Sequence, residues 1–317
     1  MVYKLQTNRV HRTYKGGSSI DEFCNSVDKR EYMPEDWTAS VTAAYDSNGN
    51  LEGIGKTLDG QLLTDIIGND DYGLLVKLLN SDERLVIQAH PTVDFAKKYL
   101  NSEFGKTECW YFLDCEPDAY VLIGFKEGAT REQWEDVFNK QDIERMTAML
   151  HKVNVKKGDF IFVDGGVPHA IGPGCFMVEL QEPSDLMVVS ERFTPSGRQI
   201  PERRMDMGLP YELMMDVYDY TAMSYEDLKK RLFPEFKEID KGIIEILGKD
   251  TTDKFRMLRL DCDGSFKCSE KYAVAICIDG EGYLCNESIK RGERLLLKNE
   301  QDIHFCGNKD FSVILCL

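Results

Sequence analysis

Four side chains of this sequence could together bind a divalent metal ion. Gln88 and His90 lie in "LVIQAHP", Glu108 lies in "GKTECWY", and His169 lies in "GGVPHAIGPG". Imidazole and carboxylate groups are typical ligands of Zn²⁺ and its divalent neighbours, and an amide oxygen is a weaker fourth ligand. Any one of these residues taken alone is more often an ordinary hydrogen-bonded side chain. The four together, with two of the chain's five histidines, predict a metal site.

The first two candidates are predicted to share one face of a β-strand. Side chains two positions apart in a strand point the same way, so Gln88 and His90 face one side while Ile87 and Ala89 face the other. The strand pattern stops at Pro91, which has no backbone N–H to donate to a sheet. We therefore expect a polar pair on one wall of a sheet.

A second stretch, residues 156–185, predicts two strands around one histidine. A Gly-Asp turn starts the apolar strand "FIFV", and the glycine and proline residues after it form the loop that presents His169. In the next strand, "CFMVELQEP", Glu179 and Gln181 share one face. A polar wall inside a small barrel requires a ligand or a metal ion to offset its desolvation.

The elements that position these residues are predicted to be mainly β-strands. Short apolar runs separated by Gly, Asp, Asn and Pro recur along the chain, for example "AYVLIGFKEG" and "YAVAICIDGEG". This spacing is typical of a sandwich or barrel of antiparallel strands. Helical periodicity is confined to residues 130–152, with Thr130 as a candidate cap, and to residues 211–232. The methionine and aromatic stripes of both segments are interpreted as core packing.

The pattern also predicts two domains. The strand spacing resumes without helical segments between Glu238 and Leu317, after a boundary near Pro234. We expect a metal-binding domain over residues 1–205, with a helical insertion at about 130–152. A helical connecting segment over 206–234 and a smaller β domain over 235–317 follow. His304 stands alone in the smaller domain, so no ligand set is expected there.

Composition and charge restrict the classes of function. A chain of 317 residues with 42% apolar residues can build real cores, and its formal charge of −16 argues against general binding to nucleic acid or to an anionic membrane. The N-terminus has no apolar stretch, and no apolar run approaches about 18 residues, so we expect a cytoplasmic protein without a membrane span. The ten scattered cysteines, none in a C-x-x-C motif, predict reduced thiols.

The motifs resemble those of a known enzyme family. "GDFIFVDGGVPHAIGPG" resembles the second conserved motif of the cupins, and "IQAHP", "GKTECWY" and "GGVPHAIGPG" in that order closely resemble the type I mannose-6-phosphate isomerases (phosphomannose isomerases) in their short bacterial form. The likeness covers most of residues 30–210. It implies two cupin-like jelly-roll β-barrels with helical insertions, the second barrel being degenerate.

The resemblance also implies a cofactor and its ligands. One Zn²⁺ per chain would be held by Gln88, His90, Glu108 and His169, with another divalent metal as the alternative. Lys106, in the Gly-Lys-x-Glu segment, would be an active-site lysine. The implied activity is the interconversion of mannose 6-phosphate and fructose 6-phosphate through an enediol, in a monomer or a homodimer.

The chemistry expected of such a site follows from its charges. One carboxylate and neutral Gln and His ligands leave a divalent ion with net positive charge, which suits oxygen anions on C1 and C2 of a sugar. A base must move the proton between these carbons, and the candidates are Lys106, Glu179 and a hydroxide at the metal. The candidates for binding the sugar phosphate are Lys106, Gln181 and Arg192.

Two departures from the family pattern leave other functions open. Val189 stands where related sequences tend to have an arginine that serves the phosphate or catalysis, and Val86 stands where many have a serine. Arg192 is the nearest substitute and is therefore the expected catalytic arginine. Three other arginines are interpreted as parts of a solvated turn: Arg198, Arg203 and Arg204. The alternatives are a metal cupin that binds a sugar or sugar phosphate without catalysis or with altered specificity, and an Fe²⁺ cupin with oxygen chemistry.

Overall fold

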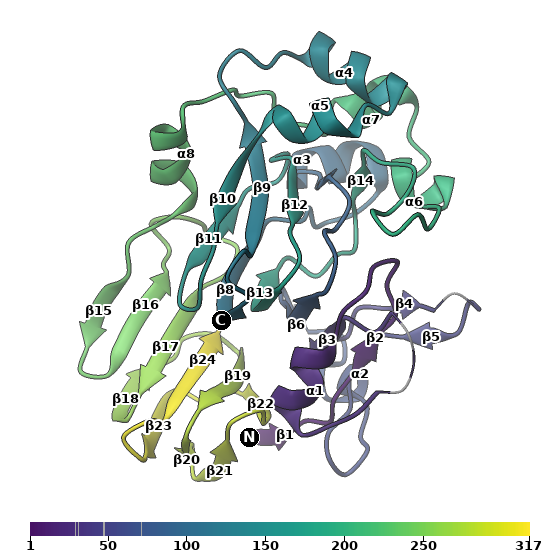
Figure 1. Ribbon diagram of the computed structural model, residues 1–317. Coiled ribbons are helices and arrows are strands. Elements are labelled where there is room, and N and C mark those ends of the chain that lie inside the picture. The colour runs from purple at the N-terminus through teal and green to yellow at the C-terminus, as the bar shows by residue number, and fades with distance from the viewer. Residues whose placement is uncertain (29, 31, 47, 71) are drawn as a thin grey trace.

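Antiparallel β-sheets are the main regular structure of the computed structural model, which describes residues 1–28, 30, 32–46, 48–70 and 72–317 (Figure 1). A five-stranded sheet contains, in spatial order, β10 (Leu150–Asn154), β9 (Tyr120–Phe125), β12 (His169–Ile171), β7 (Gln88–Ala89) and β14 (Val188–Val189). A six-stranded sheet contains β11 (Phe160–Val163), β8 (Glu108–Cys115), β13 (Cys175–Gln181), β6 (Leu75–Ser81), β3 (Glu35–Thr38) and β2 (Arg9–Val10).

These two sheets pack face to face and form the first β unit. Trp110 and Met177 from the six-stranded sheet join Val121 and Ile171 from the five-stranded sheet in one buried cluster. Side chains alternate along each strand, so positions 108, 110 and 112 of β8 face this interior while Cys109, Tyr111 and Leu113 face the other way. The space between the sheets is therefore where inward polar side chains can meet.

Helices cover the outer face of the five-stranded sheet. Figure 1 shows α4 (Arg131–Lys140), α5 (Ile143–Ala148) and α7 (Tyr211–Met215) gathered at one end of the molecule, and their apolar residues share a cluster with outward residues of β7, β9 and β12. The remaining helices are α1 (Ser18–Cys24), α2 (Leu63–Ile67), α3 (Val93–Phe95) with the π-helical turn η1 (Ala96–Leu100), α6 (Glu202–Asp206) and α8 (Tyr225–Leu232).

The C-terminal strands form a second β sandwich. Its seven-stranded sheet contains β1 (Val2–Lys4), β22 (Arg294–Lys298), β19 (Tyr272–Asp279), β24 (Ser312–Cys316), β17 (Met257–Asp261), β16 (Ile243–Leu247) and β15 (Lys237–Asp240). Its four-stranded sheet contains β18 (Asp263–Lys267), β23 (Asp302–Gly307), β20 (Glu281–Leu284) and β21 (Glu287–Lys290). A separate hairpin joins β4 (Ala44–Tyr45) to β5 (Leu51–Glu52).

The two β units share one buried core. Leu78 and Val178, on the outer face of the six-stranded sheet, belong to the same cluster as Val274, Leu296 and Ile314 of the seven-stranded sheet. The first strand of the chain also crosses between the units, because Val2 to Lys4 pair with Leu295 to Leu297. The first strand of the chain therefore belongs to the sheet of the C-terminal unit.

The mainly β fold expected from the sequence is confirmed, and the helical segments differ in detail. The expected helix at 130–152 does begin after Thr130, whose side chain accepts from Gln133 N–H in a capping box. It ends at Gln141, which has a positive φ of 53°, and α5 and strand β10 occupy the rest of the segment. The segment expected to be helical at 211–232 is likewise split into α7 and α8.

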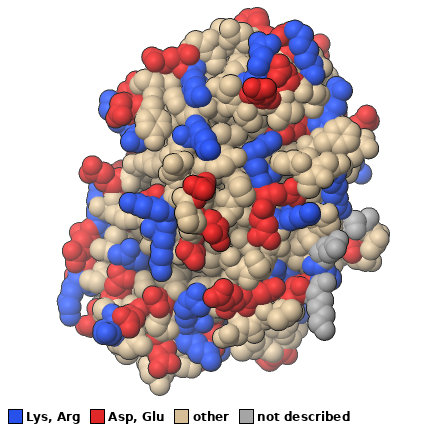
Figure 2. Space-filling view, in the orientation of Figure 1, with Lys and Arg blue, Asp and Glu red and all other residues tan. Residues whose placement is uncertain are grey.

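The surface charges, the thiols and the length of the helices add three observations. Figure 2 shows Lys and Arg interspersed with Asp and Glu over one face of the molecule. The ten cysteines are free thiols, as expected from their spacing. Among the described residues, no helix has the length and hydropathy needed to cross a membrane.

Candidate metal centre

Three of the predicted ligand residues converge between the two sheets of the first unit. The ligand atoms of His90, Glu108 and His169 all lie within 4.8 Å of one another, and all three residues are buried. Glu108 stands between the two imidazoles, with its Oε2 at 3.3 Å from His90 Nε2 and its Oε1 at 3.3 Å from His169 Nε2. The structure thus brings together two nitrogen donors and one carboxylate.

The sheets account for this convergence. Residues 169 and 88 are direct partners in the ladder between β12 and β7, which places Gln88 Nε2 at 3.3 Å from His169 Nε2. His90 follows β7 on the same face as Gln88, and Glu108 is the first residue of β8. All four predicted ligand residues therefore lie together at one end of the interior.

Glycines in two of the motifs allow the surrounding loops to approach closely. A Cβ on Gly105 would lie 2.6 Å from the carbonyl oxygen of Pro91, and a Cβ on Gly165 would lie 3.0 Å from Thr92 Cα. The backbone N–H of Lys106 donates to the Pro91 carbonyl at 3.0 Å, and that of Gly166 donates to the His90 carbonyl at 2.6 Å. The proline after His90 is thus the point where the three motifs meet.

Both imidazoles are held in the tautomer that suits metal binding. Nδ1 of His90 lies 2.9 Å from the Leu186 carbonyl oxygen, and Nδ1 of His169 lies 2.9 Å from that of Val167. A carbonyl oxygen can only accept, so Nδ1 carries the proton and the Nε2 lone pair points toward Glu108. Burial lowers the pKa of His90 and lowers that of His169 to about 3, so both rings are neutral. This donor set fits Zn²⁺.

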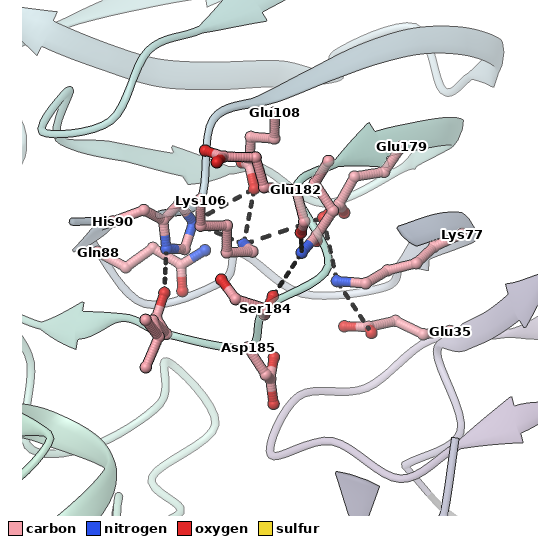
Figure 3. A network of polar contacts seen from close by, with 12 residues as sticks. Glu35, Lys77, Gln88, His90, Lys106, Glu108, Glu179, Glu182, Ser184 and Asp185 are labelled. Atoms are coloured by element: carbon pink, nitrogen blue, oxygen red, sulfur yellow. Dashed lines mark hydrogen bonds and ion pairs between the residues drawn. The ribbon is translucent and has the colours of Figure 1, made fainter. Parts of the chain in front are cut away.

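Lys106 brings a positive charge to the same atoms. Its Nζ lies 2.7 Å from His90 Nε2 and 2.6 Å from Glu108 Oε2 (Figure 3). Burial opposes ionisation of Glu108, but Lys106 and then His90 outweigh it and hold the pKa of that carboxyl well below its usual value. Two of the donor atoms, His90 Nε2 and Glu108 Oε2, therefore lie around a cation, which is a second indication that they suit a metal ion.

A cavity adjoins these donors. Its empty volume is about 700 Å³ when the open solvent at its mouth is included. Gln88, Lys106, Glu108 and Glu179 line it on the side of the donor atoms. The rest of the lining includes Arg12, Tyr14, Glu35, Lys77, Val86, Asp185, Val189, Ile200 and Arg204.

Charges of alternating sign connect the cavity mouth to the donor atoms. Arg12 donates to both carboxylate oxygens of Asp185 at 3.1 Å and contacts Glu35 at 2.9 Å. Lys77 lies 3.7 Å from Glu35 and 3.1 Å from Glu179, and Glu179 in turn lies 4.0 Å from Lys106 Nζ (Figure 3). Burial, which acts more strongly than Lys77, raises the pKa of Glu179. Glu179 is thus the acidic group of the cavity with the greatest tendency to accept a proton.

Two other predicted residues, Gln181 and Arg192, do not line the cavity. Gln181 faces inward beside Glu108 in the β13–β8 ladder, but its Nε2 donates to the Glu182 and Ser184 carbonyls at 3.0 and 2.6 Å and so ties down the loop after β13. Arg192 is exposed and does not line the cavity. The reason is that β14 ends at Val189, so Arg192 belongs to the following loop, where its backbone N–H donates to Gln141.

Sequence reasoning missed several charged residues of the cavity. Lys77 had a usable signal, because a single lysine inside "LLVKLLNS" must either break the strand or face a polar interior. Arg12 and Glu35 lie far from the motifs in sequence and had no such signal. Arg204, interpreted as part of a solvated turn, lines the cavity, so that interpretation was wrong.

Comparisons with known proteins show which proteins the chain is similar to. The chain is 30% identical over 286 residues to the probable mannose-6-phosphate isomerase GmuF of Bacillus subtilis (strain 168), an alignment that covers 87% of this chain and 85% of that protein. The crystal structure of the mannose 6-phosphate isomerase from Bacillus subtilis has a TM-score of 0.78 at 21% identity, covering 100% of this chain and 99% of that one. A zinc-bound mannose 6-phosphate isomerase has a TM-score of 0.73 at 14% identity, covering 99% and 98%. No family model matches the chain.

Proposed function

The chain belongs to the mannose-6-phosphate isomerase family, and we propose that it interconverts mannose 6-phosphate and fructose 6-phosphate at a zinc centre. The observation that carries the proposal is the convergence of His90, Glu108 and His169 beside a cavity that also holds Lys106 and Glu179. A metal site alone would suit many reactions. A second carboxylate and a lysine next to it add the acid and base groups that an aldose-ketose isomerisation requires.

The proposed metal ligands are Gln88, His90, Glu108 and His169. When bound, Zn²⁺ would supply positive charge that stabilises negative charge developing on the sugar oxygens. The backbone carbonyls of Leu186 and Val167 hold both imidazoles so that their Nε2 atoms are available to the ion.

Proton transfer is assigned to Glu179 and Lys106. The reaction moves a proton from C2 to C1 of the sugar, so one base must reach both carbons from the same side. Glu179 lines the cavity and is held by Lys77 at 3.1 Å, which fixes its carboxylate toward the interior. Lys106, at 4.0 Å from Glu179, can donate a proton to a sugar oxygen. Burial between two sheets keeps bulk water away from both groups.

The experiment is a coupled assay of fructose 6-phosphate formation from mannose 6-phosphate, with zinc content measured on the same protein. His90→Ala and His169→Ala should lose both zinc and turnover, because each removes one ligand. Glu179→Gln should keep its zinc and lose at least about a hundredfold in kcat, as expected for removal of a general base. Arg192→Ala is the matched control and should behave as wild type, because the exposed side chain lies outside the cavity.

Two outcomes would count against the proposal. If the zinc-loaded protein bound mannose 6-phosphate without forming fructose 6-phosphate, the protein would be a metal cupin that binds the sugar phosphate without catalysis. If the two histidine variants kept full zinc content at wild-type affinity, the ligand assignment would be wrong.

A further inference from the structure

One arginine of the cavity differs from the other cations there. Arg12, Lys77 and Lys106 are each paired with a buried or half-buried carboxylate. Arg204 also lines the cavity and is partly buried, but within the described part of the chain its guanidinium forms no salt bridge or side-chain hydrogen bond. Arginine is almost never fully buried without a charged partner, and a half-buried guanidinium without one has N–H groups available to an anion.

The position of Arg204 is set by a small apolar cluster in the cavity wall. Val86, Val189 and Ile200 form a small buried cluster, and Met205 packs against it. Met205 and Arg204 are neighbours in α6, which lies on β14. This apolar cluster therefore holds α6 against the cavity wall, so that Arg204 lines the cavity.

The surrounding charges favour an anionic ligand at this point. Burial and then the positive charge of Arg12 lower the pKa of Arg204 and outweigh the opposite effect of Asp185 and Glu35. The nearest acidic groups, Asp185 and Glu35, are already engaged by Arg12. A phosphate dianion entering the mouth would find a guanidinium whose N–H groups are free to donate to it, and such charge-assisted bonds are the strong ones.

We propose that Arg204 binds the phosphate group of the substrate and so makes the cavity select a sugar phosphate over a free sugar. The inference rests on the proposed function in taking a sugar phosphate as the ligand. In this arrangement the sugar ring extends from the mouth toward Lys106 and the metal ligands, and the phosphate remains at α6. Val86 and Val189 contribute indirectly, because their cluster packs against Met205 of the helix that carries the arginine.

Calorimetric binding to the zinc-loaded protein tests this directly and does not depend on turnover. Arg204→Ala should weaken binding of mannose 6-phosphate about tenfold to a hundredfold, the loss expected for one charge-assisted contact, and should leave binding of mannose unchanged. Arg204→Lys keeps the charge without the planar fork and should give an intermediate loss. Arg203→Ala, in the neighbouring exposed residue of the same helix, is the matched control and should bind both ligands as wild type does.

Several results would overturn the inference. The first is that Arg204→Ala binds mannose 6-phosphate as tightly as wild type does, and the second is that it loses as much affinity for mannose as for mannose 6-phosphate. The third is that Arg203→Ala weakens binding of mannose 6-phosphate as much as Arg204→Ala does. The fourth is that both Arg204 variants lose their zinc. The proposed function fails separately, if wild-type protein produces no fructose 6-phosphate. The wild-type protein could show no turnover and still bind mannose 6-phosphate more tightly than mannose. If Arg204→Ala then removed that preference, the result would support the inference and contradict the isomerase proposal.

Discussion

Glu35 connects more groups than any motif residue of the cavity, although nothing in the sequence marks it. Its carboxylate pairs with Arg12 at 2.9 Å and accepts hydrogen bonds from Tyr14 Oη and Trp37 Nε1, both at 2.7 Å. Lys77 lies 3.7 Å away. A buried charge is tolerated only when it is paired and hydrogen-bonded, and Glu35 meets both conditions. It thereby fixes the two cations that stand between the cavity mouth and Glu179.

We predict that Glu35→Gln lowers the free energy of unfolding by about 3 kcal/mol at pH 7, because breaking a buried pair leaves uncompensated cations. Burial opposes ionisation of Glu35, but Arg12 and Lys77 outweigh it, so its folded-state pKa lies below the ordinary value of 4.5. The stability from this charge is therefore complete above pH 4.5 and declines as the pH falls below it. Urea unfolding from pH 7 to pH 3 measures this, with the exposed Glu287→Gln as the control.

The expected pattern is a difference between wild type and Glu35→Gln that is constant near neutral pH and narrows in acid. A difference that grew as the pH fell would mean that the folded-state pKa of Glu35 is raised, contrary to the geometry. A Glu287→Gln protein as unstable as Glu35→Gln would show that the effect is one of charge number and has nothing to do with the buried pair.

Single residues were predictable only where they lay in a local motif. The four candidate ligands and Glu179 stand in short segments whose spacing reveals their common face, and the structure brings these five residues together. Arg12 reaches the cavity from the loop after β2, and Arg204 reaches it from helix α6. Their placement depends on tertiary packing, so no local pattern could distinguish them from exposed arginines.

At the scale of elements, the strands were easier to predict than the helices. The apolar side chains at 130–152 keep a helical spacing, yet the residues from Leu150 onward pair with β9 because the edge of that sheet needs a partner for its backbone groups. Gln141 ends α4 in the left-handed conformation and is held there by bonds from its Nε2 to the Phe138 and Ser190 carbonyls. Tertiary contacts thus override a periodicity that is compatible with either structure.

The contact between β9 and α8 gives a prediction at this scale. Gly124 in β9 has a φ of 64°, and a Cβ there would lie 2.7 Å from Leu228 Cδ1 of α8. We expect Gly124→Ala to cost about 1 kcal/mol of backbone strain and a further 1–3 kcal/mol of overpacking. Gly128→Ala is the matched control, because Gly128 has a φ of 84° with no atom within 4 Å of the added Cβ. Chemical denaturation of both variants separates the two contributions.

A double-mutant cycle completes the test. In a Leu228→Ala background the collision is gone, so Gly124→Ala should cost no more than Gly128→Ala does in the wild type. If the cost of Gly124→Ala were the same in both backgrounds, α8 would not be docked on β9 as the structure has it.

At the scale of the whole molecule, the two β units are joined by a shared core. The six-stranded sheet carries the metal-ligand candidate Glu108 on one face and packs against the C-terminal sheet with the other. The strand β1 adds a hydrogen-bonded connection, because the first residues of the chain pair with β22. A strand of three residues has too little pattern to be predicted, and its partner lies near the other end of the chain.

The shared core leads to a prediction about metal removal. Because Val178 and Ile314 belong to one cluster, we expect the two units to unfold together, so that zinc bound in the first unit stabilises both. Binding to the folded state alone adds about 4 kcal/mol at a free zinc concentration a thousand times the Kd. Calorimetry should therefore show one transition for the zinc-loaded protein and one, at a Tm several degrees lower, after chelation. The His304→Ala control should respond to zinc as wild type does, and His169→Ala should respond much less. A second transition whose Tm is independent of zinc would show that the C-terminal unit folds on its own, and would contradict a common core.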